Sequence, residues 1–167
     1  MASQLRVDKI LPVDGAPTSG GGGIIQVVST TLTTPTSTTN ASAFEDISGL
    51  SVAITPKFST SKVLLMVSLG SISVNSQSVG FRLLRGSTQI GGATSTTLQS
   101  GFTNVYAAAD YIMSASHNFL DSPSATSATT YKLQWRVASG TAYLNRYRGN
   151  DTEYNGSSTI TAMEVSA

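Results

Sequence analysis

The stretch YKLQWRVASGTAYLNR, Tyr131 to Arg146, carries the clearest structural pattern in the chain. Apolar and polar side chains alternate along its first half: Leu133, Trp135 and Val137 against Lys132, Gln134 and Arg136. This alternation is typical of an antiparallel strand with one buried face, so Trp135 is expected in the core. Ser139-Gly140 is a turn signal between two strand-like runs, and the whole stretch therefore predicts a β-hairpin.

The same pattern extends outward through most of the chain. A second hairpin is predicted in GFRLLRGSTQIGG, with its turn at 85–88, and no stretch from Ile24 onward has the periodicity of a helix. Many short strands in one domain-sized segment predict an all-β fold, a single antiparallel β-sandwich. The predicted strands are Ile24–Leu32, Ser51–Ile54, Lys62–Val74, Gly80–Arg85, Thr88–Ile90, Asn104–Ser114, Thr130–Val137, Thr141–Asn145 and Ser158–Val165.

Two segments are predicted to be exposed connections, and one strand has an unusual composition. The connections are the Thr-rich end of 29–42 and the loop 121–130. In the last strand, Ile160, Ala162 and Glu164 share one face, while Thr161, Met163 and Val165 share the other. Because neither face is purely polar, this strand is expected to be buried on both sides or to lie at a subunit contact.

Composition excludes several classes of protein. The chain has 167 residues, a net charge of +1, only 11% charged residues, 26 Ser and 22 Thr. Without a basic run, neither nucleic acid nor a membrane surface is an expected partner. No apolar run approaches the roughly 20 residues that span a bilayer, and the chain does not start like a secretory signal. With no Cys, it offers no disulfide and no thiolate ligand.

The first 23 residues differ from the rest. SQLRVDKILPVDG can form one short strand, and Gly20–Gly23 form a flexible linker, since neither a P-loop Lys nor a helix follows them. Residues 1–23 are therefore predicted to be an attachment arm with its linker, and residues 24–167 the sandwich domain. The apolar side chains that would fill pockets on a partner are Leu5, Val7, Ile10, Leu11 and Val13.

Candidate catalytic and metal-binding groups are sparse. His117, the single histidine, could pair with Asp110 or Asp121, but beside Phe119 it is better interpreted as a hydrogen-bonded loop or strand-end residue. Two acidic pairs, Glu45 with Asp46 and Asp151 with Glu153, could in principle serve a glycosidase or a calcium ion. Their spacing matches no motif, so they are interpreted as solvated loop charges. The expectation is a protein without catalytic residues, metal or cofactor.

The segment YLNRYRGNDTEYNG, residues 143–156, is the candidate contact surface. Tyr and Arg dominate contact energies at interfaces, and aromatic faces with amides also suit sugar rings. The alternative is a long loop whose tyrosines pack on their own domain. The residues concerned are Tyr143, Arg146, Tyr147, Arg148 and Tyr154.

The order of several pieces resembles a known group of proteins. SQLRVDKILPVDG resembles the S-x-L-x-V-D-x-I … G starts of tail-fibre and other virion proteins of marine tailed bacteriophages, including cyanophages. The resemblance continues in GGGGIIQVV, FEDISGLSVAITPKFSTSKVLLMV, VGFRLLRGSTQIG and STITAMEVS. It implies a virion structural protein whose compact β domain, of jelly-roll or tumour-necrosis-factor-like type, forms homotrimers.

The resemblance leaves the place in the particle open. One hypothesis is a non-enzymatic short fibre or spike, made in the bacterial host cytoplasm, whose arm docks on a capsid, portal, adaptor or tail protein and whose outer loops touch the host surface. The second is a capsid decoration or cement protein that clamps neighbouring capsid subunits. The third, from the Tyr-rich segment and the scattered acids, is a carbohydrate-binding or hydrolytic module, for which a host surface glycan is the expected partner.

Overall fold

The structure, a computed structural model, describes residues 23–94, 100–108, 111–149, 152 and 154–166, and these contain strands but no helix. The strands are β1 (Ile24–Leu32), β2 (Thr36–Thr38), β3 (Glu45–Ile54), β4 (Lys62–Val74), β5 (Gln77–Arg85), β6 (Thr88–Ile90), β7 (Thr103–Ala107), β8 (Met113–Asp121), β9 (Thr129–Val137), β10 (Ala142–Leu144) and β11 (Ser158–Val165). The all-β prediction is confirmed.

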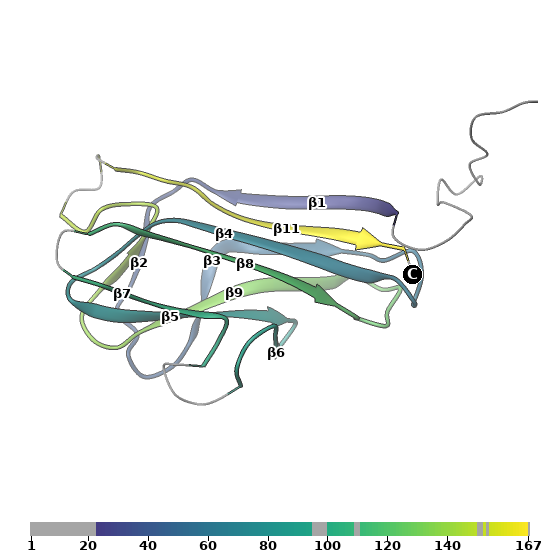
Figure 1. Cartoon of the computed structure of the whole chain (residues 1–167), viewed down its shortest axis with the longest axis horizontal. Coiled ribbons are helices and arrows are strands. Elements are labelled where there is room, and N and C mark those ends of the chain that lie inside the picture. Colours follow the sequence, from purple (N-terminus) through teal and green to yellow (C-terminus); the bar gives the residue numbers. More distant parts are fainter. Residues whose placement is uncertain (1–22, 95–99, 109–110, 150–151, 153, 167) are drawn as a thin grey trace, which may run out of the picture.

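The strands form two antiparallel sheets packed face to face (Figure 1). In the first sheet the order is β1-β11-β4-β8, and β10 joins the end of β4 to β2. In the second sheet the order is β3-β9-β5, and both β6 and β7 pair with β5. The pairs β1:β11, β3:β9, β4:β8 and β5:β7 are nested in the sequence, which is the connectivity of a jelly roll.

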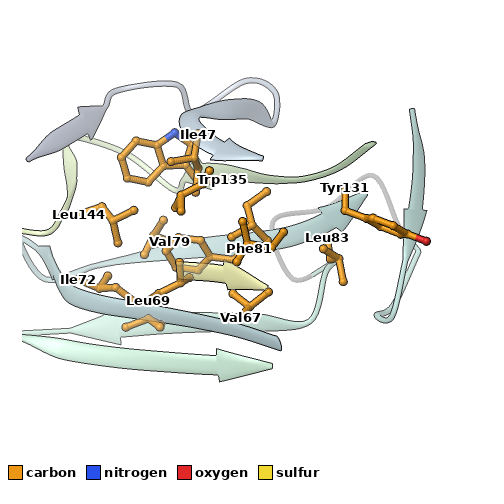
Figure 2. Packing of buried hydrophobic residues seen from close by; sticks show 14 of the residues in the cluster. Ile47, Val67, Leu69, Ile72, Val79, Phe81, Leu83, Tyr131, Trp135 and Leu144 are labelled. Carbon is orange, nitrogen blue, oxygen red and sulfur yellow. The ribbon is translucent and has the colours of Figure 1, made fainter. Parts of the chain in front are cut away.

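The core lies between the sheets and is filled by the inward-facing residues of both. Figure 2 shows Trp135 and Phe81 from the second sheet packed among aliphatic side chains such as Leu69 and Ile72 from the first. Trp135 is 2% exposed, and β9 alternates between buried and half-buried residues along its central part. The predicted alternation of this strand and the core position of Trp135 are both confirmed.

The predicted hairpin over residues 131–146 is wrong. β9 pairs with β3 and β5 in the second sheet, whereas β10 pairs with β2 and β4 in the first. The turn at Ser139-Gly140, with φ of +66° at Gly140, carries the chain from one sheet to the other. A turn signal reports only a local change of direction, and the choice of strand partner depends on the rest of the sandwich. The other predicted hairpin is confirmed, because Leu83 pairs with Ile90 across the turn between β5 and β6.

Three further strand boundaries differ from the prediction. Residues 104–114 do not form one strand, because β7 belongs to the second sheet and the following β8 to the first. β8 also includes the segment MSASHNFLD, so His117 lies in mid-strand. The Thr-rich segment contains β2, and β3 begins at Glu45, six residues before the predicted start, with an irregular register around Gly49 (φ +84°). A segment rich in β-branched residues, like β2, or one with an irregular register, like β3, can still form a strand when a neighbouring strand supplies hydrogen bonds.

The two ends of the described chain meet at one end of the sandwich. The Ser166 backbone NH donates a hydrogen bond to the Gly23 carbonyl, 2.9 Å away, and β1 pairs with β11 along their length. In Figure 1 this is the end marked C, where β1 also starts. The predicted arm residues 1–22 lie outside the described residues, so the division at Gly23 stays a prediction.

Candidate functional site

The end of the sandwich opposite the termini collects the candidate contact residues. β1, β5 and β9 run between the two ends, so the turn from β4 to β5, the turn from β9 to β10 and the described residues of 145–157 all lie at this far end (Figure 1). We call it the loop end. Connections supported on a rigid sandwich are where binding residues are most often found.

Asn145 fixes the start of the Tyr- and Arg-rich segment. It is fully buried in the left-handed region, at φ of +62°. Its side-chain NH₂ donates to the Leu32 carbonyl at 2.8 Å, and its side-chain oxygen accepts from the Ser158 hydroxyl at 2.7 Å. Because these partners lie at the end of β1 and the start of β11, Asn145 positions the loop against both strands of the first sheet.

Four of the five predicted contact residues form two pairs at the loop end. The guanidinium of Arg146 lies 4.8 Å from the ring centre of Tyr143, and the rings of Tyr147 and Tyr154 meet edge to face at 5.9 Å. Tyr154 is 66% exposed, while Arg148 and the other three are partly buried. The tyrosines thus pack on their own domain and still leave aromatic surface in solvent; their role in contact stays a prediction.

A polar pocket lies beside these residues. It has a volume of about 350 Å³ and is lined by side chains from the two turns, the start of β5, β10 and the segment that follows β10: Asn75, Gln77, Ser139, Thr141, Tyr143 and Arg148, with Gly140. Its lining carries amides, hydroxyls, one aromatic ring and one cation, but no carboxylate. These groups can hydrogen-bond hydroxyls from several directions and can accept a negative charge on the Arg148 side.

His117 is held in an aromatic stack and is not paired with Asp121. Its ring lies 4.6 Å from that of Phe102, nearly parallel, and 6.4 Å from that of Phe119. Burial lowers the pKa of His117, which favours the neutral imidazole. Asp121 lies four residues further along the same strand, which separates the two residues by about 13 Å. Asp110, the other suggested partner, lies outside the described residues.

Asp121 instead joins the two sheets through a buried cluster. Its carboxylate accepts hydrogen bonds from Arg85 at 2.9 Å and from the Tyr131 hydroxyl at 2.7 Å. Burial raises the pKa of Tyr131 strongly, and the hydrogen bond to Asp121 acts in the same direction, so Tyr131 remains a proton donor. Since Asp121 is in β8 and its partners are in β5 and β9, the cluster is a tie between sheets.

The interpretation of Glu45 and Asp46 as loop charges is wrong, because both residues start β3. Asp46 accepts from Lys132 and from Gln134, each at 2.8 Å, whereas Glu45 accepts from Thr38 and from Asn40. Neighbouring strand residues point to opposite faces, so the two carboxylates do not converge. Asp151 and Glu153 lie outside the described residues.

Within the described part of the chain, no three His, Asp or Glu side chains gather where they could hold a metal ion. In the same residues there is also no helix long and apolar enough to cross a membrane. The predicted attachment residues Leu5, Val7, Ile10, Leu11 and Val13 fall outside the described residues.

Comparisons with known proteins found similarity in structure only. One similar structure is the crystal structure of the infectious bursal disease virus VP2 subviral particle. It has a TM-score of 0.43 and 14% identity, and the match covers 84% of this chain and 38% of that one. The structure of the Gx strain of the same virus gives a TM-score of 0.34 and 14% identity, with 99% and 44% covered. This chain thus spans less than half the length of either. No family model and no curated protein matches.

Sequence reasoning missed half of the loop end. Asn75, Gln77 and Ser139 line the pocket although they lie far from the Tyr-rich segment in the sequence. They lie in turns between predicted strands, and this position could have marked them as candidate binding residues. Their meeting with Tyr143 depended on which strands became neighbours, and the sequence did not specify this.

Proposed function

We propose that this chain is a non-enzymatic structural protein of a tailed-bacteriophage virion, a homotrimeric short fibre or spike. Its N-terminal arm docks on another virion protein, and its loop end points outward to the host surface. The sequence resemblance to phage virion proteins motivates the proposal.

The observation that carries the proposal is that the two ends of the domain differ in what they carry. Residue Gly23, where the arm joins the body, pairs with Ser166 at one end, and the Tyr- and Arg-rich segment lies at the other. An arm that docks on a particle through the terminal end leaves the loop end free in solvent. Three arms on one trimer would also multiply the strength of attachment without any new kind of contact.

Incorporation into particles tests the arm. Deleting residues 1–19 removes the predicted anchor but none of the described strands, so the body is expected to fold and to be absent from purified virions. A sharper variant replaces Leu5 and Ile10 with Asp, and its matched control replaces Arg6 and Lys9 with Ser. The first variant is expected to be absent from purified particles, and the control is expected to be incorporated at the wild-type level.

Two results would contradict this proposal. Normal occupancy of the arm-deleted protein would exclude docking through residues 1–19. A copy number in the hundreds per virion, measured by quantitative mass spectrometry, would favour the capsid decoration protein over the fibre or spike, which is present in tens.

A second function, glycan binding at the loop end, is favoured by the polar pocket. The amides of Asn75 and Gln77 and the ring of Tyr143 supply hydrogen bonds and a stacking face in one depression of about 350 Å³. Glycan-array binding by the wild-type protein, lost in Gln77→Ala and in Tyr143→Ala, is the expected result. Equal and negligible signals for all three proteins would remove glycan binding as a function.

A further inference from the structure

The outward faces of the two sheets differ sharply in charge. On the second sheet, Asp46 pairs with Lys132 at 2.8 Å, and Arg82 lies over the ring of Phe44 at 3.6 Å. Arg136, half-buried near the end of β9, also faces outward and donates a hydrogen bond to the Ala41 carbonyl at 2.9 Å. This face is therefore a charged and hydrogen-bonded surface of the kind that water covers.

The outward face of the first sheet carries an apolar row across four strands. Strand register places Val27 opposite Met163, Met163 opposite Leu64, and Leu64 opposite Leu120. The row thus crosses β1, β11, β4 and β8 without a break. Val27 is 55% exposed and Leu120 47% exposed, so the row is open at both edges of the sheet.

The next row across the same face is mixed but still uncharged. Ser29, Thr161, Met66 and Asn118 stand opposite one another in register, and Met66 is 42% exposed. The hydroxyls of Ser29 and Thr161 bond each other at 2.8 Å, which satisfies them within the sheet. A shallow groove of about 380 Å³ lies along this row.

A third row consists only of hydroxyl side chains. Thr31, Thr159, Ser68 and Ser116 are in register, and the Thr31 and Thr159 hydroxyls lie 3.2 Å apart. No charged side chain stands in any of the three rows. Packing another surface against this face would therefore require no charge to leave water, which is the costly part of burying a sheet face.

We infer that the three uncharged rows on the outer surface of β1-β11-β4-β8, which Lys62 borders in the row beyond Leu64, are where copies of this chain associate with one another. A second copy is the fitting occupant because it brings an uncharged surface of the same kind, with two pairs of hydroxyls already bonded to each other and apolar side chains to bury. The charged groups of a charged partner would lose their hydration on this face, and no opposite charge in these rows would offset that cost. The inference rests on the proposed homotrimer and assigns its contact surface.

The size of the face is adequate for such a contact. Four strands about 4.8 Å apart and nine residues long give a face of roughly 570 Å² in flat projection. Two such faces would together bury about 1,100 Å², close to the lower limit of specific protein interfaces. With this face turned towards a threefold axis, each copy can contact both neighbours.

The test introduces one charge on each sheet in turn. In Met66→Lys, a charge enters the centre of the uncharged face, where the side chain is already partly in solvent and the monomer can still fold. Its matched control, Asn104→Lys, places the same charge on an exposed position of β7 in the second sheet. Mass is measured by sedimentation and light scattering on the full chain, and folding by circular dichroism and thermal unfolding.

The wild type and Asn104→Lys are expected to be trimers, and Met66→Lys a folded monomer, or a trimer at least tenfold weaker. Leu120→Lys, at the edge of the same face, is expected to weaken association less. A Met66→Lys protein with the wild-type mass would overturn the assignment of this face and leave the trimer intact. A wild-type protein that is a monomer at every concentration would overturn both the assignment of this face and the proposed homotrimer. The arm variants would still test the virion role separately, by incorporation into particles.

Discussion

Three buried polar residues each connect strands, or a strand and a loop, that lie far apart in the sequence. Asn145 and Asp121 each tie strands that are distant in the sequence, and Glu164 does the same at the terminal end. The sequence placed Glu164 in phase with Ile160 and Ala162, and the structure buries all three completely. An acid in phase with apolar residues therefore signalled a hydrogen-bonded carboxylate.

The carboxylate of Glu164 predicts a pH dependence of stability. Burial raises its pKa, but hydrogen bonds from the Gln26 amide at 2.5 Å and from the Lys57 backbone NH at 2.7 Å outweigh burial, and the pKa is lowered below its ordinary 4.5. A lowered folded-state pKa stabilises the fold above the unfolded value, and this contribution is lost as pH falls through the folded value.

Urea unfolding of wild type and Glu164→Gln from pH 8 to pH 3 tests this. The variant is expected to be less stable by about 1–3 kcal/mol between pH 5 and 8. The difference from wild type should then shrink below about pH 4.5. Asp46→Asn, which breaks an exposed ion pair, is the control and should cost at most about 1 kcal/mol. A difference for Glu164→Gln that stays constant down to pH 3 would contradict the prediction.

At the scale of elements, similar turns can either keep the chain in one sheet or carry it to the other. The β5–β6 turn joins two paired strands, whereas the Ser139-Gly140 turn and the β7–β8 connection join strands in different sheets. The sequences of the two turns are similar in kind, with Gly beside Ser. Their different roles follow from which strands pair with those that the turns join, not from the turn residues.

Gly140 gives a prediction at this scale. Its φ is +66°, and an added Cβ would meet no atom within 4 Å, so substitution costs only backbone conformation. Gly140→Ala is expected to lower the free energy of unfolding by about 1–2 kcal/mol, and Gly140→Asn by less, because Asn tolerates left-handed φ better. Both values follow from urea titrations. Equal stability of the Ala variant and the wild type would show that the turn relaxes to another conformation.

At the scale of the whole molecule, nested pairing makes the last strand indispensable. β11 lies between β1 and β4 and supplies Ile160 and Ala162 to the core, so it holds the two earlier strands of the first sheet together. The first sheet is therefore incomplete until β11 has been made.

A pair of truncations tests this. A chain ending at residue 157 lacks β11 and is expected to show no cooperative unfolding transition, while a chain ending at residue 165 keeps β11 and should unfold like the full-length protein. Thermal unfolding followed by circular dichroism distinguishes them. A cooperative transition in the shorter chain would mean that β1 and β4 can close the sheet by themselves.

The sequence by itself determined the class of the fold and most strand positions. Side-chain alternation and turn residues act over a few neighbours, so β1, β4, β6 and β11 were predicted with their observed bounds, and Trp135 was correctly placed in the core. Composition alone also led to the prediction of a contact surface in the Tyr- and Arg-rich segment.

Only the tertiary structure decided the partners. Which strands pair is a long-range choice, made by fitting two apolar faces together, and no local pattern encodes it. That choice separated β9 from β10, brought Asp121 to Tyr131 rather than to His117, and placed Asn75 beside Tyr143 in one pocket. It also aligned the uncharged rows of four strands on one face, a feature visible only once the register is known.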